Sequence, residues 1–248
     1  MMPVSRPAEG ETLSARTSTL LKRRQTKANS YVEGSAAIGG AWKAFGGTDA
    51  KKEVAEKLEK VFFGKCAYCE ITVARDVEHY YPKSLYPKQM FQWDNFLFAC
   101  KNCNTDKSNR FPVDDNVPLL LDPCNDEPAD FITWDLVDSG QPILPPDRRL
   151  AETLAFLPQL RAQSLATLRL QAARNFKWLL TEVLEPTPRP SDALAWLESE
   201  VDPKQQWMSV RRQILRDPDW QPIITKVRTQ YPHLGPMFDA IVDPRSDP

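Results

Sequence analysis

Two short cysteine pairs are the residues of this chain whose spacing most directly indicates chemistry. Each pair has the form C-x2-C, and a glutamate, a histidine and an asparagine stand between the pairs. Two thiolates separated by two residues can bind one ion, and two such pairs complete the tetrahedral shell that Zn²⁺ prefers. Because four thiolates leave no open coordination position, the sequence predicts a structural zinc site formed by Cys66, Cys69, Cys100 and Cys103.

Disulfides are the alternative use of these cysteines, and the expected compartment disfavours them. No apolar run approaches the ~20 residues needed to span a bilayer, and the segment from Met1 to Arg24 contains no apolar secretory region. We therefore expect a cytoplasmic protein without membrane contact, where thiols stay reduced and C-x2-C pairs bind metal. The remaining cysteine, Cys124, is expected to be a small buried residue or a free thiol.

The histidine between the cysteine pairs, His79, is the candidate general base. A histidine with its ordinary pKa near ~6.5 can accept a proton from water at neutral pH. Glu78 and Asn104 could offer oxygen ligands to a second cation, Mg²⁺ or Mn²⁺, which would bind a scissile phosphate. The alternative for His79 is a surface histidine or a core histidine with satisfied hydrogen bonds. The other histidine, His233, lies in a proline-bounded tail, where a structural or solvated role is expected.

Hydrophobic spacing predicts the elements that must position these side chains. Apolar residues recur at helical spacing from Thr48 to a stop at Gly64, directly before the first cysteine pair. Residues 72–81 alternate as a strand would, with His79 and Glu78 on opposite faces, and the apolar run 96–99 predicts a second, buried strand. A helix is expected to open at residues 103–108. The predicted order is strand, loop, strand, helix.

The regions outside this core differ from it in composition. Residues 1–47 contain two glycine pairs and the basic run Lys22–Lys27, and they predict a weakly structured N-terminal arm that contacts phosphate or a partner, or is simply solvated. In residues 126–248 we expect short strands, including a hairpin of 131–134 with 141–144, and then amphipathic helices. Residues 119–123 are a further candidate strand. The fold class is therefore α+β, with residues 48–125 as the zinc-bound domain and a mostly α-helical C-terminal region.

Overall charge excludes strong long-range attraction to nucleic acid. The chain of 248 residues has a formal net charge of -1, so a nucleic-acid surface would have to arise from local placement of Lys and Arg. Basic residues do cluster around the candidate site, and phosphate contacts would give affinity without reading sequence. The candidate phosphate contacts are Lys83, Lys101 and Lys107.

These motifs together resemble the HNH endonuclease motif of the ββα-metal, or His-Me finger, superfamily. The first histidine of that motif falls on His79, the central asparagine on Asn95 and the last position on Asn104. The resemblance implies that His79 activates water, that Asn95 braces the loop and orients the histidine, and that Glu78 and Asn104 hold the catalytic metal. The chain departs from the motif twice, with Glu78 in place of aspartate and Asn104 in place of histidine, and both departures keep an oxygen ligand available.

A narrower resemblance covers mainly residues 50–125. The segments Cys66–Glu70, Glu78–Ser84, Trp93–Asn95 and Leu121–Pro123 are similar to the HNH subunits of Septu-type antiphage systems, the PtuB-like proteins also found with some retrons. This resemblance implies a DNA endonuclease that works beside a PtuA-like ABC-type ATPase. The C-terminal helices would then form a platform for a partner or a substrate.

Two function classes follow from the sequence. In one, the chain is a metal-dependent HNH DNA endonuclease within a bacterial antiphage defence complex. In the other, it is a non-catalytic zinc-finger module that binds nucleic acid or a protein partner, and Glu78, His79 and Asn104 are structural. Loss of cleavage on removal of the His79 imidazole, with zinc retained, would distinguish the first class from the second.

Overall fold

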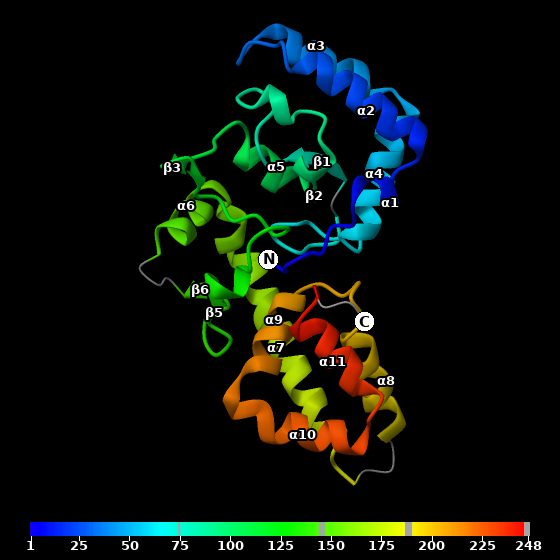
Figure 1. The fold of residues 1–248 in the computed structure, drawn as a ribbon. Coiled ribbons are helices and arrows are strands. Elements are labelled where there is room, and N and C mark those ends of the chain that lie inside the picture. Colours follow the sequence, from blue (N-terminus) through cyan, green and yellow to red (C-terminus); the bar gives the residue numbers. More distant parts are fainter. Residues whose placement is uncertain (74, 144–146, 187–189, 246–248) are drawn as a thin grey trace.

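A computed structural model describes residues 1–73, 75–143, 147–186 and 190–245. It confirms the α+β class, with small two-stranded sheets among many helices (Figure 1). The helices are α1 Glu9–Thr12, α2 Ala15–Ala28, α3 Ala36–Gly46, α4 Asp49–Val61, α5 Lys101–Lys107, α6 Arg148–Phe156, α7 Gln163–Glu182, α8 Pro190–Glu200, α9 Met208–Arg216, α10 Gln221–Gln230 and α11 Leu234–Val242. The strands are β1 Asp76–His79, β2 Phe96–Ala99, β3 Val113–Asp114, β4 Val117–Pro118, β5 Thr133–Trp134 and β6 Pro142–Ile143.

The central hairpin pairs β1 with β2 in antiparallel register. Val77 lies opposite Phe98, and His79 lies opposite Phe96 at the open end. Strand β1 is shorter than the predicted 72–81, and residue 74 of that range lies outside the described residues. Helix α5 follows β2 directly and contacts β1, so the predicted order of strand, loop, strand and helix is confirmed. The predicted helix before the first cysteine pair is also confirmed, because α4 begins after Thr48, whose side chain accepts from the backbone N–H of Lys51.

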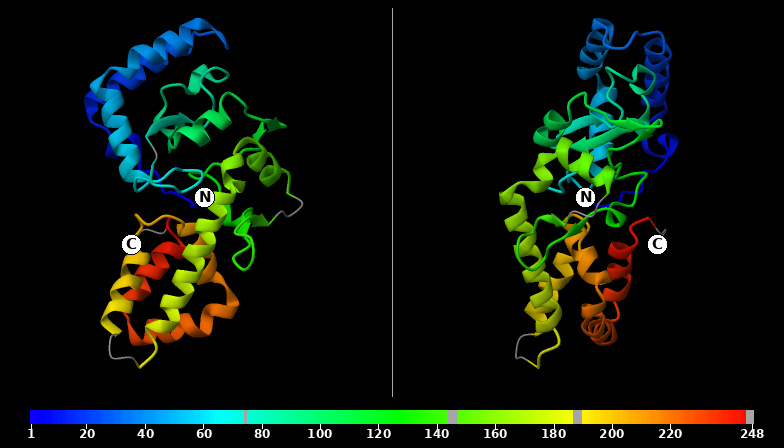
Figure 2. Two further views of the ribbon diagram at one scale, coloured as in Figure 1. Left: turned by 180° about the vertical axis from the view of Figure 1, so that it is seen from behind. Right: turned by 90° about the vertical axis from the view of Figure 1, so that its left-hand side faces the viewer.

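The N-terminal region is helical, and the expectation of a weakly structured arm in residues 1–47 was wrong. Helices α2, α3 and α4 form a layer on one side of the β1–β2 hairpin (Figures 1 and 2). Leu21, Ile38 and Phe45 of this region are buried in the common core. Glu53 of α4 accepts hydrogen bonds from the Thr17 and Ser14 hydroxyls at 2.6 and 2.8 Å and so joins α4 to the start of α2. Tertiary packing therefore outweighs the weak helix propensity of the glycines.

The C-terminal helices α7 to α11 gather at the end of the molecule opposite α2 and α3 (Figure 1). Helix α7 is the long amphipathic helix expected after Pro158, and the expected hairpin is β5 with β6. Leu144, assigned to that hairpin from sequence, lies outside the described residues. Residues 119–123 form no strand, contrary to the prediction. A hairpin of β3 with β4 lies just before them instead, and its turn contains two residues with positive φ, Asp115 and Asn116.

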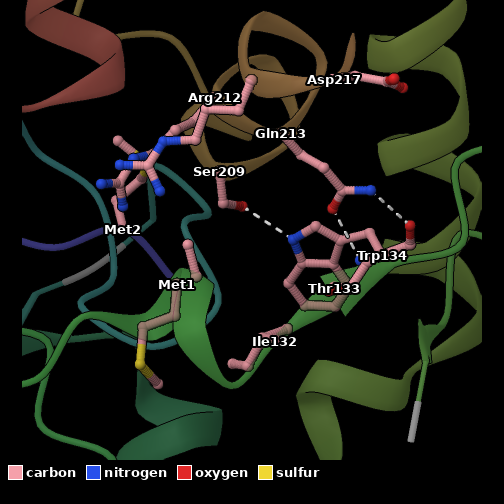
Figure 3. Close-up of a pocket in the computed structure, with 11 residues that line it drawn as sticks. Met1, Met2, Ile132, Thr133, Trp134, Ser209, Arg212, Gln213 and Asp217 are labelled. Carbon is pink, nitrogen blue, oxygen red and sulfur yellow. Dashed lines mark hydrogen bonds between the residues drawn. The ribbon is translucent and has the colours of Figure 1, made fainter. Parts of the chain in front are cut away.

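A small cleft lies where β5 meets α9 (Figure 3). Gln213 accepts from the backbone N–H of Trp134 and donates to its carbonyl, both at 2.8 Å, and the Trp134 indole donates to the Ser209 hydroxyl at 3.2 Å. Nearby, the buried Arg212 forms a two-pronged ion pair with Glu127. These hydrogen bonds link β5 to α9 and so connect the C-terminal helices to the rest of the chain.

No helix among the described residues is both long enough and apolar enough to cross a membrane.

Candidate active site and metal centre

The four cysteines form one compact, buried cluster. Their sulfur atoms all lie within 4.8 Å of one another, and the Cys69 and Cys100 Sγ atoms are 3.8 Å apart. A tetrahedral zinc ion with Zn–S bonds of about 2.3 Å requires S···S separations of about 3.8 Å. The donor set and its geometry therefore fit zinc, and the structure supports the predicted structural metal site at Cys66, Cys69, Cys100 and Cys103.

Local backbone geometry explains how each pair turns toward the shared centre. In the first pair the backbone N–H of Glu70 returns to the Cys66 carbonyl at 3.0 Å, and Glu70 has a φ of 63°. In the second pair Cys100 caps α5, and its sulfur accepts from the Cys103 N–H at 3.4 Å. The first pair is joined to the hairpin by a hydrogen bond from the Ala67 N–H to the Phe98 carbonyl at 2.8 Å. The four-cysteine cluster thus connects the turn that precedes β1 with the end of β2 and with α5.

His79 lies at the open end of the hairpin. Its two ring nitrogens have different surroundings. Its Nε2 lies 3.0 Å from the Met90 carbonyl oxygen, which can only accept, so Nε2 carries the proton and donates. Burial is the main reason that the pKa of His79 lies well below its usual value, with the Lys83 ammonium adding to the effect. The neutral ring therefore keeps a lone pair on Nδ1, the form that a general base requires.

Asn95 braces the loop that supplies the Met90 carbonyl. Its side-chain oxygen accepts from the Tyr81 N–H at 2.7 Å, and its Nδ2 donates to the carbonyls of Tyr81 and Gln89 at 3.0 and 2.9 Å. These bonds close the long β1–β2 connection on both sides. Asn95 is buried, so its amide groups face no competition from water. The loop, and with it the hydrogen-bond partner of His79, is held in one position.

Glu78 and Asn104 line the same hollow as His79, which has a volume of about 260 Å³ and is also lined by Lys83. Glu78 Oε1 lies 2.6 Å from the Lys107 ammonium, and both side chains are buried. Burial raises the pKa of Glu78, while Lys107 opposes this rise. Asn104 donates its Nδ2 to Asp76 Oδ2 at 2.8 Å, so its amide oxygen is not committed to that bond. The hollow therefore gathers four of the predicted site residues, Glu78, His79, Lys83 and Asn104, around one space.

The side-chain oxygen atoms that line this hollow are of the kind that binds hard divalent cations. A carboxylate from Glu78 and an amide oxygen from Asn104 are ligands that Mg²⁺ and Mn²⁺ accept. Glu78 Oε1 is buried and makes no hydrogen bond within the described residues, although it is ion-paired with Lys107. A cation held here would therefore share the Glu78 carboxylate with an ammonium group.

The predicted phosphate contacts lie in three different settings. Lys101 is exposed at the first turn of α5, and Lys83 is half-buried at the hollow. Lys107 is fully buried, and its ammonium donates to the His79 carbonyl oxygen at 2.8 Å besides pairing with Glu78. This position corrects the expectation that Lys107 contacts phosphate, because its buried ammonium is already bonded to the His79 carbonyl and the Glu78 carboxylate of β1. Away from the site, the exposed His233 pairs with Glu198 at 2.8 Å.

Several groups at the site were missed by sequence reasoning. Asp76 shares a strand face with Glu78 two residues later, and the period of two along a strand could have revealed it. Lys107 was named as a phosphate contact, but its buried position was missed; it follows Cys103 by four residues, a helical spacing that places both on the inner face of α5. The Met90 carbonyl and the Trp42 ring, whose centroid is 4.4 Å from that of His79, left no signal in the sequence.

These observations define an α+β protein with a buried four-cysteine centre beside a histidine-containing hollow. Comparison with known proteins adds partial matches to Septu proteins. The chain is 31% identical over 114 residues to the Septu protein PtuB of Bacillus mycoides (strain KBAB4), which covers 34% of this chain and 39% of that protein. It is 34% identical over 73 residues to the Septu protein PtuB of Bacillus thuringiensis, which covers 27% of each.

A third match is to a protein of a different name. The chain is 32% identical over 111 residues to the Septu protein PtuA of Bacillus mycoides (strain KBAB4), covering 32% of this chain and 16% of that protein. No protein-family model matches the chain. The chain thus spans less than half the length of each of these relatives, and the likeness supports a Septu-like protein over about a third of its own sequence.

Proposed function

We propose that this chain is a metal-dependent nuclease of the HNH type, which hydrolyses phosphodiester bonds of DNA. The observation that carries the proposal is the state of His79. Its Nε2 is bound to the Met90 carbonyl at 3.0 Å, its ring is neutral because burial lowers its pKa, and the residue lines a hollow with Glu78, Asn104 and Lys83. A neutral imidazole with one fixed and one free nitrogen is prepared to take a proton from water.

The chemistry assigned to each residue follows from this arrangement. His79 Nδ1 accepts the proton of a water molecule whose oxygen attacks phosphorus, and the bond from phosphorus to the leaving oxygen breaks. Asn95 keeps the connecting loop in place, so the Met90 carbonyl continues to orient the ring. Glu78 and Asn104 would hold Mg²⁺ or Mn²⁺, which when bound neutralises the charge that develops on the leaving oxygen. The zinc centre supports the hairpin and takes no part in the chemistry.

The biological setting that we propose is a bacterial antiphage defence complex containing an ABC-type ATPase. The partial similarity to two Septu PtuB proteins and one Septu PtuA protein supports this setting. The C-terminal helices lie apart from the β1–β2 hairpin (Figure 1), and we assign the surface for such a partner to them. Co-purification of the chain with an ABC-type ATPase encoded beside it would support the proposed assembly, and separate elution at micromolar concentrations of both proteins would contradict it.

The nuclease proposal is tested by replacing His79 with alanine and measuring plasmid nicking with Mg²⁺ or Mn²⁺. We expect the rate to fall by roughly 100-fold or more, the usual contribution of a general base. His233→Ala is the matched control, because it removes the other histidine from an exposed position. Zinc content and thermal unfolding of both variants must match those of the parent.

Two outcomes separate the function classes. If His79→Ala nicks DNA as fast as the parent, His79 is not the base. If the parent binds DNA but leaves it uncut with either metal, the chain is a non-catalytic zinc module.

A further inference from the structure

Two residues that precede the first cysteine pair lie against the His79 site. Trp42 of α3 has its ring centroid 4.4 Å from the His79 ring, and the planes meet at 67°. Lys51 of α4 has its ammonium 4.4 Å from the centroid of the Trp42 ring. The N-terminal layer of helices therefore supplies part of the wall around the candidate base, although neither residue belongs to the β1–β2 hairpin or α5.

A second ammonium group lies near the same indole. Lys83, which follows β1, has its Nζ 5.6 Å from the Trp42 centroid and lines the hollow with His79. Within the described residues, the ammonium groups of Lys51 and Lys83 form no ion pair or hydrogen bond, in contrast to that of Lys107, which pairs with Glu78. The carboxylate that most favours the charged form of Lys51 is Asp76, which accepts a hydrogen bond from Asn104. Three lysine side chains thus lie in a region that contains two carboxylates, Asp76 and Glu78.

This gathering of lysine side chains is costly, because the carboxylates of Asp76 and Glu78 offset only part of the effect of burial. The pKa of Lys51 is lowered to about 7, chiefly by burial; Asp76 opposes this fall and the neighbouring Lys83 adds to it. Burial also lowers the pKa of Lys83. A partly buried ammonium without a counter-charge is unfavourable, whereas an arriving anion relieves the desolvation and the mutual repulsion together. The indole faces hold such cations by cation–π attraction without neutralising them.

We propose that Lys51 and Lys83 bind a phosphodiester group of a nucleic-acid strand next to His79, with Trp42 as the rigid platform between the two ammonium groups and the imidazole. This inference deepens the proposed nuclease function and rests on it. Lys83 lines the hollow, and Lys51 of α4 lies with it against the Trp42 ring, so the two ammonium groups come from different elements toward one phosphate. A phosphate held there places its phosphorus near the face of the hollow that His79 lines.

The test measures binding of fluorescently labelled oligonucleotides to the full-length, zinc-loaded chain without added Mg²⁺ or Mn²⁺. For Lys51→Met we expect the Kd to rise roughly fivefold, and the slope of log K against log salt to shrink by about one, as for loss of one phosphate contact. Lys52→Met is the matched control, because the neighbouring Lys52 is exposed and its ammonium lies 3.9 Å from the Glu56 carboxylate on the surface of α4. Lys51→Arg, which keeps the charge, should retain the salt slope.

Separate arms with duplex DNA, single-stranded DNA and RNA identify which nucleic acid supplies the phosphate. The proposal is overturned if Lys51→Met and Lys52→Met have the same Kd and salt slope in all three arms. Should the parent cut DNA in that case, the nuclease function stands and only the phosphate site is lost. If Lys51→Met weakens binding while the parent cuts nothing, the phosphate site is supported and the nuclease function fails.

Discussion

Burial acts on His79 and Glu78 in the same direction, toward the uncharged form, although their pKa values move oppositely. Burial lowers the pKa of His79 and raises that of Glu78, because an ion in either place loses its hydration. For His79 the neutral form is also the base that the proposed reaction requires. For Glu78 the Lys107 ammonium opposes the effect of burial. Burial thus favours a neutral His79 ring, whereas the Glu78 carboxylate is paired with an ammonium group.

The first prediction at the residue scale concerns the pH dependence of cleavage. Because the pKa of His79 is lowered, its neutral form is present above the lowered value and is lost only below it. The rate of nicking should therefore stay constant from about pH 8 down through the ordinary histidine value of ~6.5, and its acid limb should fall at lower pH. Initial rates over this range provide the measurement. An acid limb centred at or above the ordinary value would contradict the arrangement described for the ring.

The second prediction concerns the ion pair of Lys107 with Glu78. Lys107→Met leaves the Glu78 carboxylate buried without its ammonium, and breaking a buried pair this way typically costs about 3 kcal/mol. We expect that loss in the free energy of unfolding, measured by urea denaturation with zinc present. Lys101→Met on the exposed face of the same helix should change it by less than about 0.5 kcal/mol. Adding Glu78→Gln to Lys107→Met should recover part of the stability, and no recovery would exclude the proposed cause.

At the scale of elements, close packing decides where the short hairpins lie. Gly140 ends the turn between β5 and β6 with a φ of 67°, and an added Cβ would overlap the backbone carbonyl of Ala166 in α7. The hairpin therefore approaches α7 more closely than any side chain at this position allows. Arg169 of α7 adds a hydrogen bond of 3.3 Å to the Gly140 carbonyl and lies 4.0 Å from the Trp134 ring. The β5–β6 turn thus packs directly on the backbone of α7 at Gly140.

This packing predicts that Gly140→Ala destabilises the chain much more than Gly64→Ala. Both glycines have positive φ, of 67° and 71°, but a Cβ on Gly64 meets nothing within 4 Å. Gly64→Ala should cost about 1 kcal/mol, the backbone penalty alone, and Gly140→Ala about 3 kcal/mol or more, because a steric overlap is added. Urea denaturation of both variants measures the difference. Equal losses would show that α7 does not constrain the turn.

At the scale of the whole molecule, the zinc centre joins regions that are distant in sequence. Next to the first cysteine pair, Lys65 donates to the Gln205 carbonyl at 3.1 Å, and Glu70 accepts from the Ser209 N–H at 3.1 Å. These bonds attach the segment before α9 and its first turn to the zinc-binding turn. The cysteines themselves belong to the common buried core. Loss of the metal should therefore destabilise the C-terminal helices as well as the hairpin.

Removal of zinc by a chelator is predicted to unfold the centre and loosen the C-terminal helices. Structural zinc sites contribute apparent binding free energies of order 10 kcal/mol, which is comparable to the stability of a whole domain. We expect a marked fall in Tm together with loss of the near-ultraviolet circular dichroism of buried tryptophans such as Trp134 and Trp207. Readdition of zinc should restore both signals. A chelated chain with unchanged Tm would refute the structural role of the metal.

The sequence by itself determined the cysteine pairs, the strands β1 and β2 and the helices α4, α5 and α7, because these depend on local spacing and hydrophobic periodicity. It did not reveal α2 and α3, whose helical form depends on packing against the rest of the chain. Only the tertiary structure decided which groups surround His79. The Met90 carbonyl, the Trp42 ring and the Lys51 ammonium reach it from a loop and from two helices of the N-terminal layer. Lys107 likewise turned from an expected phosphate contact into the partner of Glu78. Such contacts depend on long-range packing and burial, which no pattern of neighbouring residues encodes.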